Sequence, residues 1–267
     1  MQSWYFSEQS YAPAWDAPVS PKVTAPSSLV DPETAHRLLQ EFIVECKLAD
    51  ELGMNIMTNE HHAAYTCMSV SALMTLAVLA THTKRARLLA LGVPIMNRMD
   101  PYRVAEEAAY VDILSRGRLE LGLIKGSTFE LYMSNSNPVT SNARYWEAHD
   151  LILKALTTHD GPFSWEGEFF QYRAVNIWPR PIQQPHPPVW MTGMSVETGT
   201  LAAERGHVVG TLLSGGLAKP MYDAYRKRAR ELGWEAGPDR FAYAAIVGVG
   251  ATREEGLRRA NAVADYV

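Results

Sequence analysis

A carboxylate and two imidazoles follow one another in Asn59-Glu60-His61-His62, directly after a short apolar run that begins at Ile56. A helical pattern before this run stops at Gly53, so the run is predicted to be a strand that ends at these four residues. In an α/β barrel, catalytic groups lie at the C-terminal ends of the strands. Because an imidazole exchanges protons near neutral pH, His61 is the first candidate for acid–base chemistry. The alternative is a strand-end histidine that is satisfied by a backbone carbonyl.

The remaining histidines are poorly placed for chemistry. A metal centre would need ligands from several strand ends, and the sequence places histidines at only one strand end, the pair His61-His62. The others fall within helical patterns, in connections or at the start of a strand: His36, His149, His82, His159, His186 and His207. We therefore predict no metal site and expect the demanding chemistry to come from a bound cofactor.

Length and composition fit one domain with a large hydrophobic core. The chain has 267 residues, 47% of them hydrophobic, and a formal net charge of −4. A domain of roughly 250 residues buries a large core, and α/β barrels often have this length. The mild acidity predicts no binding to nucleic acid or to anionic lipid, and no apolar run reaches the ~18 residues that a membrane-spanning helix needs.

The two cysteines and the N-terminus indicate the compartment. Cys46 and Cys67 lie among apolar neighbours and are too few for a disulfide framework, which predicts buried, inert thiols. The first residues, Met1 to Phe6, lack a basic segment followed by an apolar one. We expect a cytoplasmic protein.

Strand and helix patterns alternate along the chain. The predicted strands cover residues 4–7, 55–58, 86–95, 118–124, 189–192, 208–212 and 241–249, and the predicted helices cover 32–52, 69–80, 101–116, 144–156, 195–205, 218–232 and 252–267. Asp31-Pro32 and Asp100-Pro101 are strong helix starts, since each combines a capping aspartate with a proline at the first position. A β-hairpin is predicted over residues 163–170, and residues 179–188 form a proline-rich linker.

The count of strands gives an incomplete barrel. Seven strand–helix units are found, whereas closure of an eight-stranded barrel needs one more. We predict a single barrel domain over residues 1–267, truncated after the seventh unit, and the alternative is a natural stop. The unpaired edge of such a barrel invites association, so the chain is expected to be poorly soluble or dimeric, with a homodimer as the expected partner arrangement.

Several motifs, taken in order, resemble the bacterial luciferase-like family of flavin-dependent oxidoreductases from about Asp31 to Val267. They are Asn59-Glu60-His61-His62, Leu91-Gly92-Val93-Pro94-Ile95, Asp100-Pro101-Tyr102-Arg103-Val104-Ala105-Glu106-Glu107, Ser115-Arg116-Gly117-Arg118 and Pro187-Pro188-Val189-Trp190. The resemblance implies a TIM (β/α)₈ barrel that binds reduced FMN, or in some branches the deazaflavin F420. It also implies a monooxygenase that uses O₂ on a small organic substrate, with a separate flavin reductase as partner.

The resemblance also implies roles for particular residues. His61 matches the active-site histidine of the luciferase catalytic subunit. Gly92 and Val93 match a position beneath the flavin ring where many members have a non-proline cis peptide, and an ordinary strand bulge is the alternative. Lys125 takes the place of a phosphate-contacting arginine, and lysine keeps the charge but loses the bidentate fork.

A phosphate site is predicted at the start of the helix over residues 195–205. Gly193 lets the chain turn closely, Met194 follows it, and the free amides beginning at Ser195 suit an anion. Ser195 and Thr198 match phosphate-binding positions of the luciferase subunit, although plain capping of the helix by Ser195 would leave the same sequence. Met194 replaces a glutamate of that subunit, and this departure casts doubt on a luciferase-like aldehyde reaction.

Three other functions stay open. An F420-dependent dehydrogenase or reductase would use the same barrel, a non-catalytic protein would bind flavin only, and a fragment would be inactive. The substrate is not readable, because the loops that set specificity, residues 11–28 and 127–142, carry no chemical code.

Overall fold

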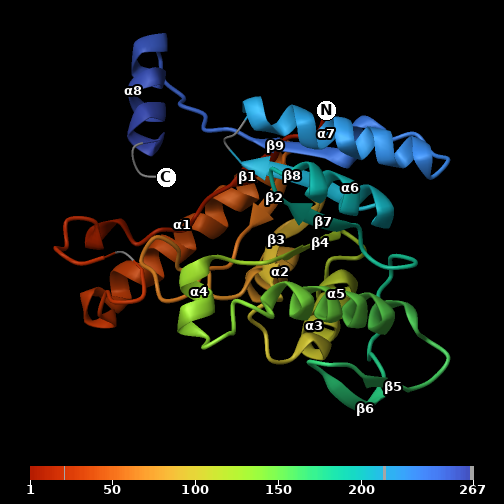
Figure 1. Ribbon diagram of the computed structural model, residues 1–267. Coiled ribbons are helices and arrows are strands. Elements are labelled where there is room, and N and C mark those ends of the chain that lie inside the picture. Colours follow the sequence, from red (N-terminus) through yellow and green to blue (C-terminus); the bar gives the residue numbers. More distant parts are fainter. Residues whose placement is uncertain (21, 213–214, 265–267) are drawn as a thin grey trace. The chain divides into compact units, whose positions relative to one another are not determined.

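The computed structural model describes residues 1–20, 22–212 and 215–264. The predicted end of the last helix, residues 265–267, lies outside the described residues. The chain divides into two compact units, Met1–Val189 and Trp190–Val267. Figure 1 shows the helices and strands of both.

The first unit is built on four parallel strands in the order β1-β2-β3-β4. Their bounds are β1 (Trp4–Phe6), β2 (Asn55–Thr58), β3 (Leu88–Pro94) and β4 (Leu119–Ile124). The helices are α1 (Pro32–Glu51), α2 (Ala72–His82), α3 (Pro101–Leu114), α4 (Thr128–Met133) and α5 (Ser141–Thr157), with short 3₁₀ turns at Ala12–Ala14 and Ser27–Leu29. Because the strands are parallel, their C-terminal ends share one edge, where the loops after β2, β3 and β4 emerge.

The predicted helix starts are confirmed. The Asp31 carboxylate accepts a hydrogen bond from the Thr34 amide at 2.9 Å, and Asp100 caps α3 in the same way. Helix α2 begins at Ala72 rather than at residue 69, because Ser71 caps it by accepting from the Met74 amide at 3.2 Å.

The core of the first unit lies between the strands and their helices. Leu119, Leu121 and Leu123 alternate along β4, and all three are fully buried in this core. Burial of each such side chain contributes roughly 1.5–3 kcal/mol. The alternation places Glu120 and Gly122 on the opposite face of the strand, where the close packing of Gly122 leaves no room for a side chain.

The hairpin is longer than predicted. Its strands are β5 (Phe163–Glu166) and β6 (Gln171–Val175), so residues 163–170 cover only the first strand and the turn. The Gly167 amide closes that turn by donating to the Phe170 carbonyl. The Glu147 carboxylate of α5 fixes it by accepting from the Trp165 indole at 3.1 Å and from the Phe170 amide at 3.0 Å.

The second unit continues the alternation with three parallel strands in the order β7-β8-β9. Its elements are β7 (Val189–Thr192, whose first residue ends the first unit), α6 (Val196–Arg205), β8 (Val208–Leu212), α7 (Gly215–Glu231), β9 (Phe241–Ala244) and α8 (Arg253–Ala264), with a 3₁₀ turn at Pro238–Arg240. Helices α6 and α7 pack so closely that a Cβ at Gly199 would collide with the Met221 carbonyl. Within the described ranges, no helix is both long and apolar enough to cross a membrane.

The prediction that β9 reaches residue 249 is wrong. Val247 and Val249 are largely exposed, and the segment contacts α8 instead of a neighbouring strand. Arg259 of α8 donates a hydrogen bond to the Val249 carbonyl at 2.8 Å, and Gly248 lies against Gly256. The apolar alternation predicted a strand, but no strand partner pairs with this segment among the described residues.

Candidate active site

His61 is held by a buried carboxylate from a distant part of the chain. Its Nδ1 atom lies 2.9 Å from Oε1 of Glu130, although the two residues are 69 positions apart. The other carboxylate oxygen of Glu130 accepts from the Ser127 amide and hydroxyl, each at 2.8 Å. These bonds form the capping box of α4, so the start of this helix fixes the group that orients His61.

The pKa values of the pair shift in opposite directions. Burial raises the pKa of the Glu130 carboxyl, but the hydrogen bonds from His61 and Ser127 outweigh it and leave the pKa below its ordinary value. The hydrogen bond to Glu130 raises the pKa of His61, against the opposing effect of burial. Since ionised Glu130 can only accept, Nδ1 carries a proton and Nε2 is the nitrogen left for proton exchange.

The long loop after β1 covers the His61 segment. Three backbone hydrogen bonds tie the two together: Val23 amide to Ala63 carbonyl at 2.6 Å, Tyr11 amide to Tyr65 carbonyl at 2.7 Å, and Met68 amide to Gln9 carbonyl at 2.9 Å. On another side, the Phe129 ring lies 6.2 Å from the His61 ring, and the Lys22 ammonium lies 5.2 Å from the centre of the Phe129 ring. His61 therefore packs against fixed groups on two sides, while its side chain stays 29% exposed and open to a reactant.

Glu60 orients its neighbours. Its buried carboxylate accepts from the Arg98 guanidinium at 2.6 Å and from the Ala72 amide at 3.1 Å, and it lies 3.1 Å from Nε2 of His62. These contacts join the loop after β2 to the loop after β3 and to the start of α2. They agree with the expectation that Glu60 orients the motif rather than reacts.

The backbone around Gly92 is unusual. The non-proline cis peptide lies between Leu91 and Gly92, one bond earlier than the predicted Gly92-Val93 position, at the register shift between β3 and β4. A Cβ at Gly92 would lie 2.7 Å from the Ile124 side chain and 2.8 Å from the Gly122 carbonyl, so only glycine fits. The Val93 side chain is fully buried in the core, which leaves its backbone as the part available to a ligand.

Lys125 is exposed and directed toward α5. Its ammonium lies 5.7 Å from the centre of the Tyr145 ring. The alternation along β4 explains this direction, because Leu121 and Leu123 already face the helices and Lys125 follows in the same phase. The predicted phosphate contact of Lys125 stays a prediction.

In the second unit, Gly193, Met194, Ser195 and Thr198 gather at the start of α6. Ser195 Oγ accepts from the Thr198 amide at 3.1 Å and lies 3.0 Å from Thr198 Oγ1. A Cβ at Gly193 would lie 2.6 Å from Thr198 Oγ1, so glycine is required for the close turn. Met194 is half exposed. The first amides of the helix have no intrahelical acceptor, and with two adjacent hydroxyls they fit a phosphate group.

Two residues of the site were missed by the sequence reasoning. Glu130 carried a readable signal, because Ser127 and Glu130 have the spacing of a capping box and predict a helix where a plain loop was assigned. Arg98 carried none, since nothing near it in the sequence identifies Glu60 as its partner. Among the described residues, no group of three or more His, Cys, Asp or Glu side chains could hold a metal ion.

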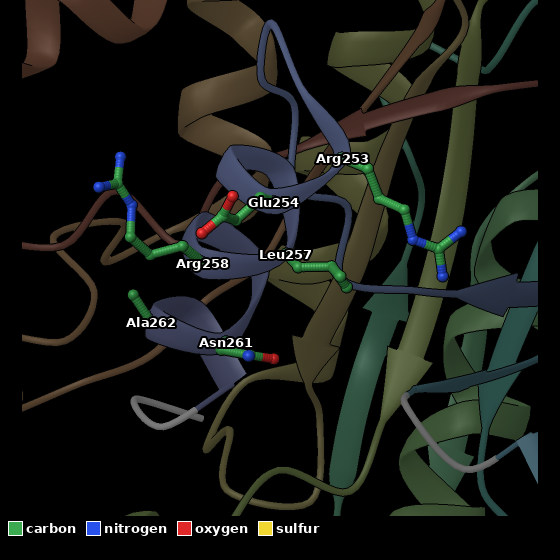
Figure 2. Close-up of a pocket in the computed structure, with 6 residues that line it drawn as sticks. All are labelled: Arg253, Glu254, Leu257, Arg258, Asn261 and Ala262. Carbon is green, nitrogen blue, oxygen red and sulfur yellow. The ribbon is translucent and has the colours of Figure 1, made fainter.

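Two hollows differ in their relation to this site. The larger, of about 730 Å³, is lined by α8 alone, as Figure 2 shows: Arg253, Glu254, Leu257, Arg258, Asn261 and Ala262. One helix face cannot enclose a ligand, and none of the predicted site residues lies there. The smaller, of about 200 Å³, is lined by Glu130 and His62, so it adjoins the His61 pair.

Comparison with known proteins places the chain in a family. Residues 24–267 match the model of the luciferase-like monooxygenase family, and the chain belongs to this family. The resemblance of the motifs is thereby confirmed.

Individual relatives agree. The chain is 31% identical over 181 residues to the oxygenase component of the flavin-dependent trigonelline monooxygenase of Acinetobacter baylyi, which covers 66% of this chain and 49% of that protein. Monooxygenase RslO1 of Streptomyces bottropensis superposes with a TM-score of 0.78 at 25% identity, over 89% of this chain and 76% of the other. The oxygenating constituent of 3,6-diketocamphane monooxygenase of Pseudomonas putida, in complex with FMN, superposes with a TM-score of 0.72 at 21% identity. The match covers 84% of this chain and 66% of the other.

These likenesses confirm the predicted α/β fold of the luciferase-like barrels. The chain spans about half the length of the curated relatives it matches.

Proposed function

We propose that this chain provides the reaction site of an FMN-dependent monooxygenase, which uses reduced FMN and O₂ on a small organic substrate. The observation that carries the proposal is the contact between His61, just after the C-terminal end of β2, and the buried Glu130 of α4, in a member of this family. The 31% identical relative is a flavin-dependent oxygenase component, which favours FMN over F420 and supports a separate flavin reductase as partner.

His61 moves the proton in this proposal. Its raised pKa keeps the imidazole protonated to a higher pH than a free histidine, so Nε2 can donate to an oxygen that gains negative charge. Glu130 holds Nδ1 and stabilises the charged ring at each turnover. The pair is set before the reactants arrive, because the capping box of α4 fixes the carboxylate.

The residues of each unit fit a part of the cofactor. Ser195, Thr198 and the first amides of α6, with Gly193 and Met194 in the turn before them, would hold the phosphate, and Lys125 would add a positive charge. In the first unit, the backbone of Gly92 and Val93 would support the flavin ring. Reduced FMN, when bound, supplies the electrons that activate O₂.

Exclusion of water is the second task of the chain. The loop after β1 is tied to the His61 segment through backbone bonds at Tyr11 and Val23, and Phe129 shields the ring. A shielded site protects a reactive oxygen species from hydrolysis and from stray protons.

A second copy of this chain is the proposed protein partner. Helices α2 and α3 expose the large apolar side chains Met74, Val78 and Tyr110, and burial of such a patch would favour association. Cys46 and Cys67 are both buried, and burial raises the pKa of each thiol to about 12, which agrees with the predicted inert thiols and with a proposed cytoplasmic location.

Cofactor titration tests the proposal. FMN, reduced FMN and F420 would be titrated into the protein by calorimetry, and reduced FMN is expected to bind most tightly. Tighter binding of F420 would replace the monooxygenase by a hydride-transfer enzyme. Binding of FMN without oxygenated product, when a flavin reductase and candidate substrates are supplied, would indicate a flavin-binding protein instead.

A further inference from the structure

The proton chemistry described above does not use the cavity of about 200 Å³ in the first unit. Its walls come from the loops that follow β2 and β3 and from α4, and they include His62, Asn97, Arg98, Met99, Glu130 and Met133. Glu130 belongs both to this wall and to the His61 pair. A molecule in the cavity would therefore lie next to the proposed proton donor.

Three polar atoms in this wall lack partners. Nδ2 and Oδ1 of Asn97 and Nε of Arg98 are buried, and within the described part of the chain none has a hydrogen-bond partner. Buried polar atoms are nearly always paired, so three orphans in one wall need an explanation. The backbone of Asn97 is fixed, because its backbone N–H donates to the Pro94 carbonyl at 3.1 Å, and its side-chain Nδ2 lies near Gly126, where an added Cβ would lie 3.1 Å from it.

The charges around the cavity are already balanced. Arg98 pairs with Glu60 at 2.6 Å, and Glu130 pairs with His61 at 2.9 Å. An added carboxylate would approach ionised Glu130, and an added cation would approach Arg98. The wall thus favours an uncharged ligand.

The orphaned atoms define the polar group of that ligand. Asn97 Nδ2 and Arg98 Nε would donate to a carbonyl oxygen, while Asn97 Oδ1 would accept from an adjacent N–H. Met99 and Met133, both exposed at the rim, offer an adaptable apolar surface for the rest of the molecule. A small rotation of the Asn97 amide, a soft torsion, and a movement of the methionines would give access.

We propose that this cavity binds the carboxamide group of an uncharged small molecule, and that this molecule is the substrate. The second half of this statement rests on the proposed function. The first half concerns binding alone and is tested without flavin.

Three ligands of similar shape test the polar group by calorimetry. Benzamide offers both a carbonyl and an N–H, acetophenone only a carbonyl, and benzoate a charge. Loss of one hydrogen bond to a buried partner weakens binding roughly tenfold, so benzamide should bind at least about tenfold more tightly than either of the others. Equal affinities, or preference for benzoate, would overturn the proposal.

Variants assign the effect to Asn97. Asn97→Leu removes both amide contacts and should weaken benzamide binding by about 10–100-fold. Asn97→Asp keeps the shape if the leucine variant fails to fold, and it should still lose about tenfold because the donor is gone. Asn142→Leu, on the exposed surface of α5, is the matched control and should change nothing. Unchanged benzamide binding in a folded Asn97 variant would refute the assignment.

The flavin ring also carries an N–H beside a carbonyl, so competition with FMN distinguishes the two sources. Simultaneous binding of FMN and benzamide is expected, and displacement of benzamide by FMN would overturn the assignment to substrate. Benzamide binding in a protein that binds no FMN would leave the cavity assignment standing and remove the proposed function. FMN binding without benzamide binding would refute the cavity assignment and leave the proposed function standing.

Discussion

The two regions that carry the predicted site residues are built differently. The His61–Glu130 pair in the first unit is closed, since the carboxylate is fully buried, its bond to His61 joins residues 69 positions apart, and Ser127 holds its other oxygen. The start of α6 in the second unit is open, since Ser195 and Thr198 bond mainly to each other and their neighbours are exposed. A proton donor needs fixed geometry before the reaction, whereas an anion-binding helix start needs accessible amides. The contrast supports the proposal that the first region provides the proton chemistry and the second holds the phosphate of the cofactor.

The largest expected effect is on turnover in the closed region. His61→Ala should slow product formation by ~10²–10⁴-fold, because a positioned acid is lost, while FMN affinity changes little. Stopped-flow reoxidation of reduced FMN, with product yield and a melting curve, measures this. His82→Ala, an exposed histidine on α2, is the control. Wild-type turnover in His61→Ala would refute the proposed mechanism.

Glu130→Gln tests whether the buried carboxylate sets the charge of His61. The raised pKa of His61 adds stability that is complete below the ordinary value of 6.5 and is lost as pH rises through the folded pKa. The lowered pKa of Glu130 adds stability that is complete above the ordinary value of 4.5 and is lost as pH falls through its folded pKa.

Between pH 4.5 and pH 6.5, the Glu130→Gln variant should therefore be less stable to unfolding than the wild type by about 1–3 kcal/mol. The difference should be smaller in alkaline buffer. Its rate profile should also move to lower pH. Denaturant unfolding across pH measures the first effect. Ser127→Ala removes another partner of Glu130 without touching the His61 bond and should leave the rate profile in place. A loss that does not depend on pH would mean that Glu130 only caps α4.

Lys125→Ala tests whether the positive charge of Lys125 strengthens binding of the FMN phosphate. If the ammonium leaves Tyr145 for the phosphate, FMN binding should weaken by ~1–3 kcal/mol, while riboflavin, which has no phosphate, should be indifferent. Lys154→Ala removes a similar contact, in which the ammonium lies 4.6 Å from the centre of the Phe163 ring, and serves as the control. Equal losses for both flavins would assign Lys125 a structural role.

The smallest expected effect concerns the open region. Ser195→Ala removes the cap of α6 and should cost about 0.5–2 kcal/mol of stability, together with a loss of FMN affinity that riboflavin does not share. Ser71→Ala removes an equivalent cap from α2, where the hydroxyl accepts from the Met74 amide at 3.2 Å. The two variants should lose similar stability, and only Ser195→Ala should lose FMN affinity. Equal FMN affinity in the two variants would mean that Ser195 only caps α6 and does not bind the phosphate.

Much of this arrangement was predictable from local patterns, and the failures have particular causes. Val189–Thr192 and Val208–Leu212 were predicted to the residue, because short apolar runs between turn signals define them. The strand predicted over residues 245–249 was wrong, because apolar alternation alone does not make a strand. A strand also needs a partner strand to hydrogen-bond with. Helix α4 was missed although its capping box was readable, and with it Glu130 was lost from the predicted site.

The sequence by itself determined the alternation of strands and helices, the helix starts at Asp31, Asp100 and Ser195, and the position of His61 at a strand end. These depend on side-chain period and on hydrogen bonds between residues a few positions apart. Only the tertiary structure decided that Glu130 meets His61, that Arg98 meets Glu60, and that Lys125 reaches toward Tyr145. Each of these contacts joins loops or elements far apart in the chain, where burial and the facing of strands select the partner and local spacing carries no information about it.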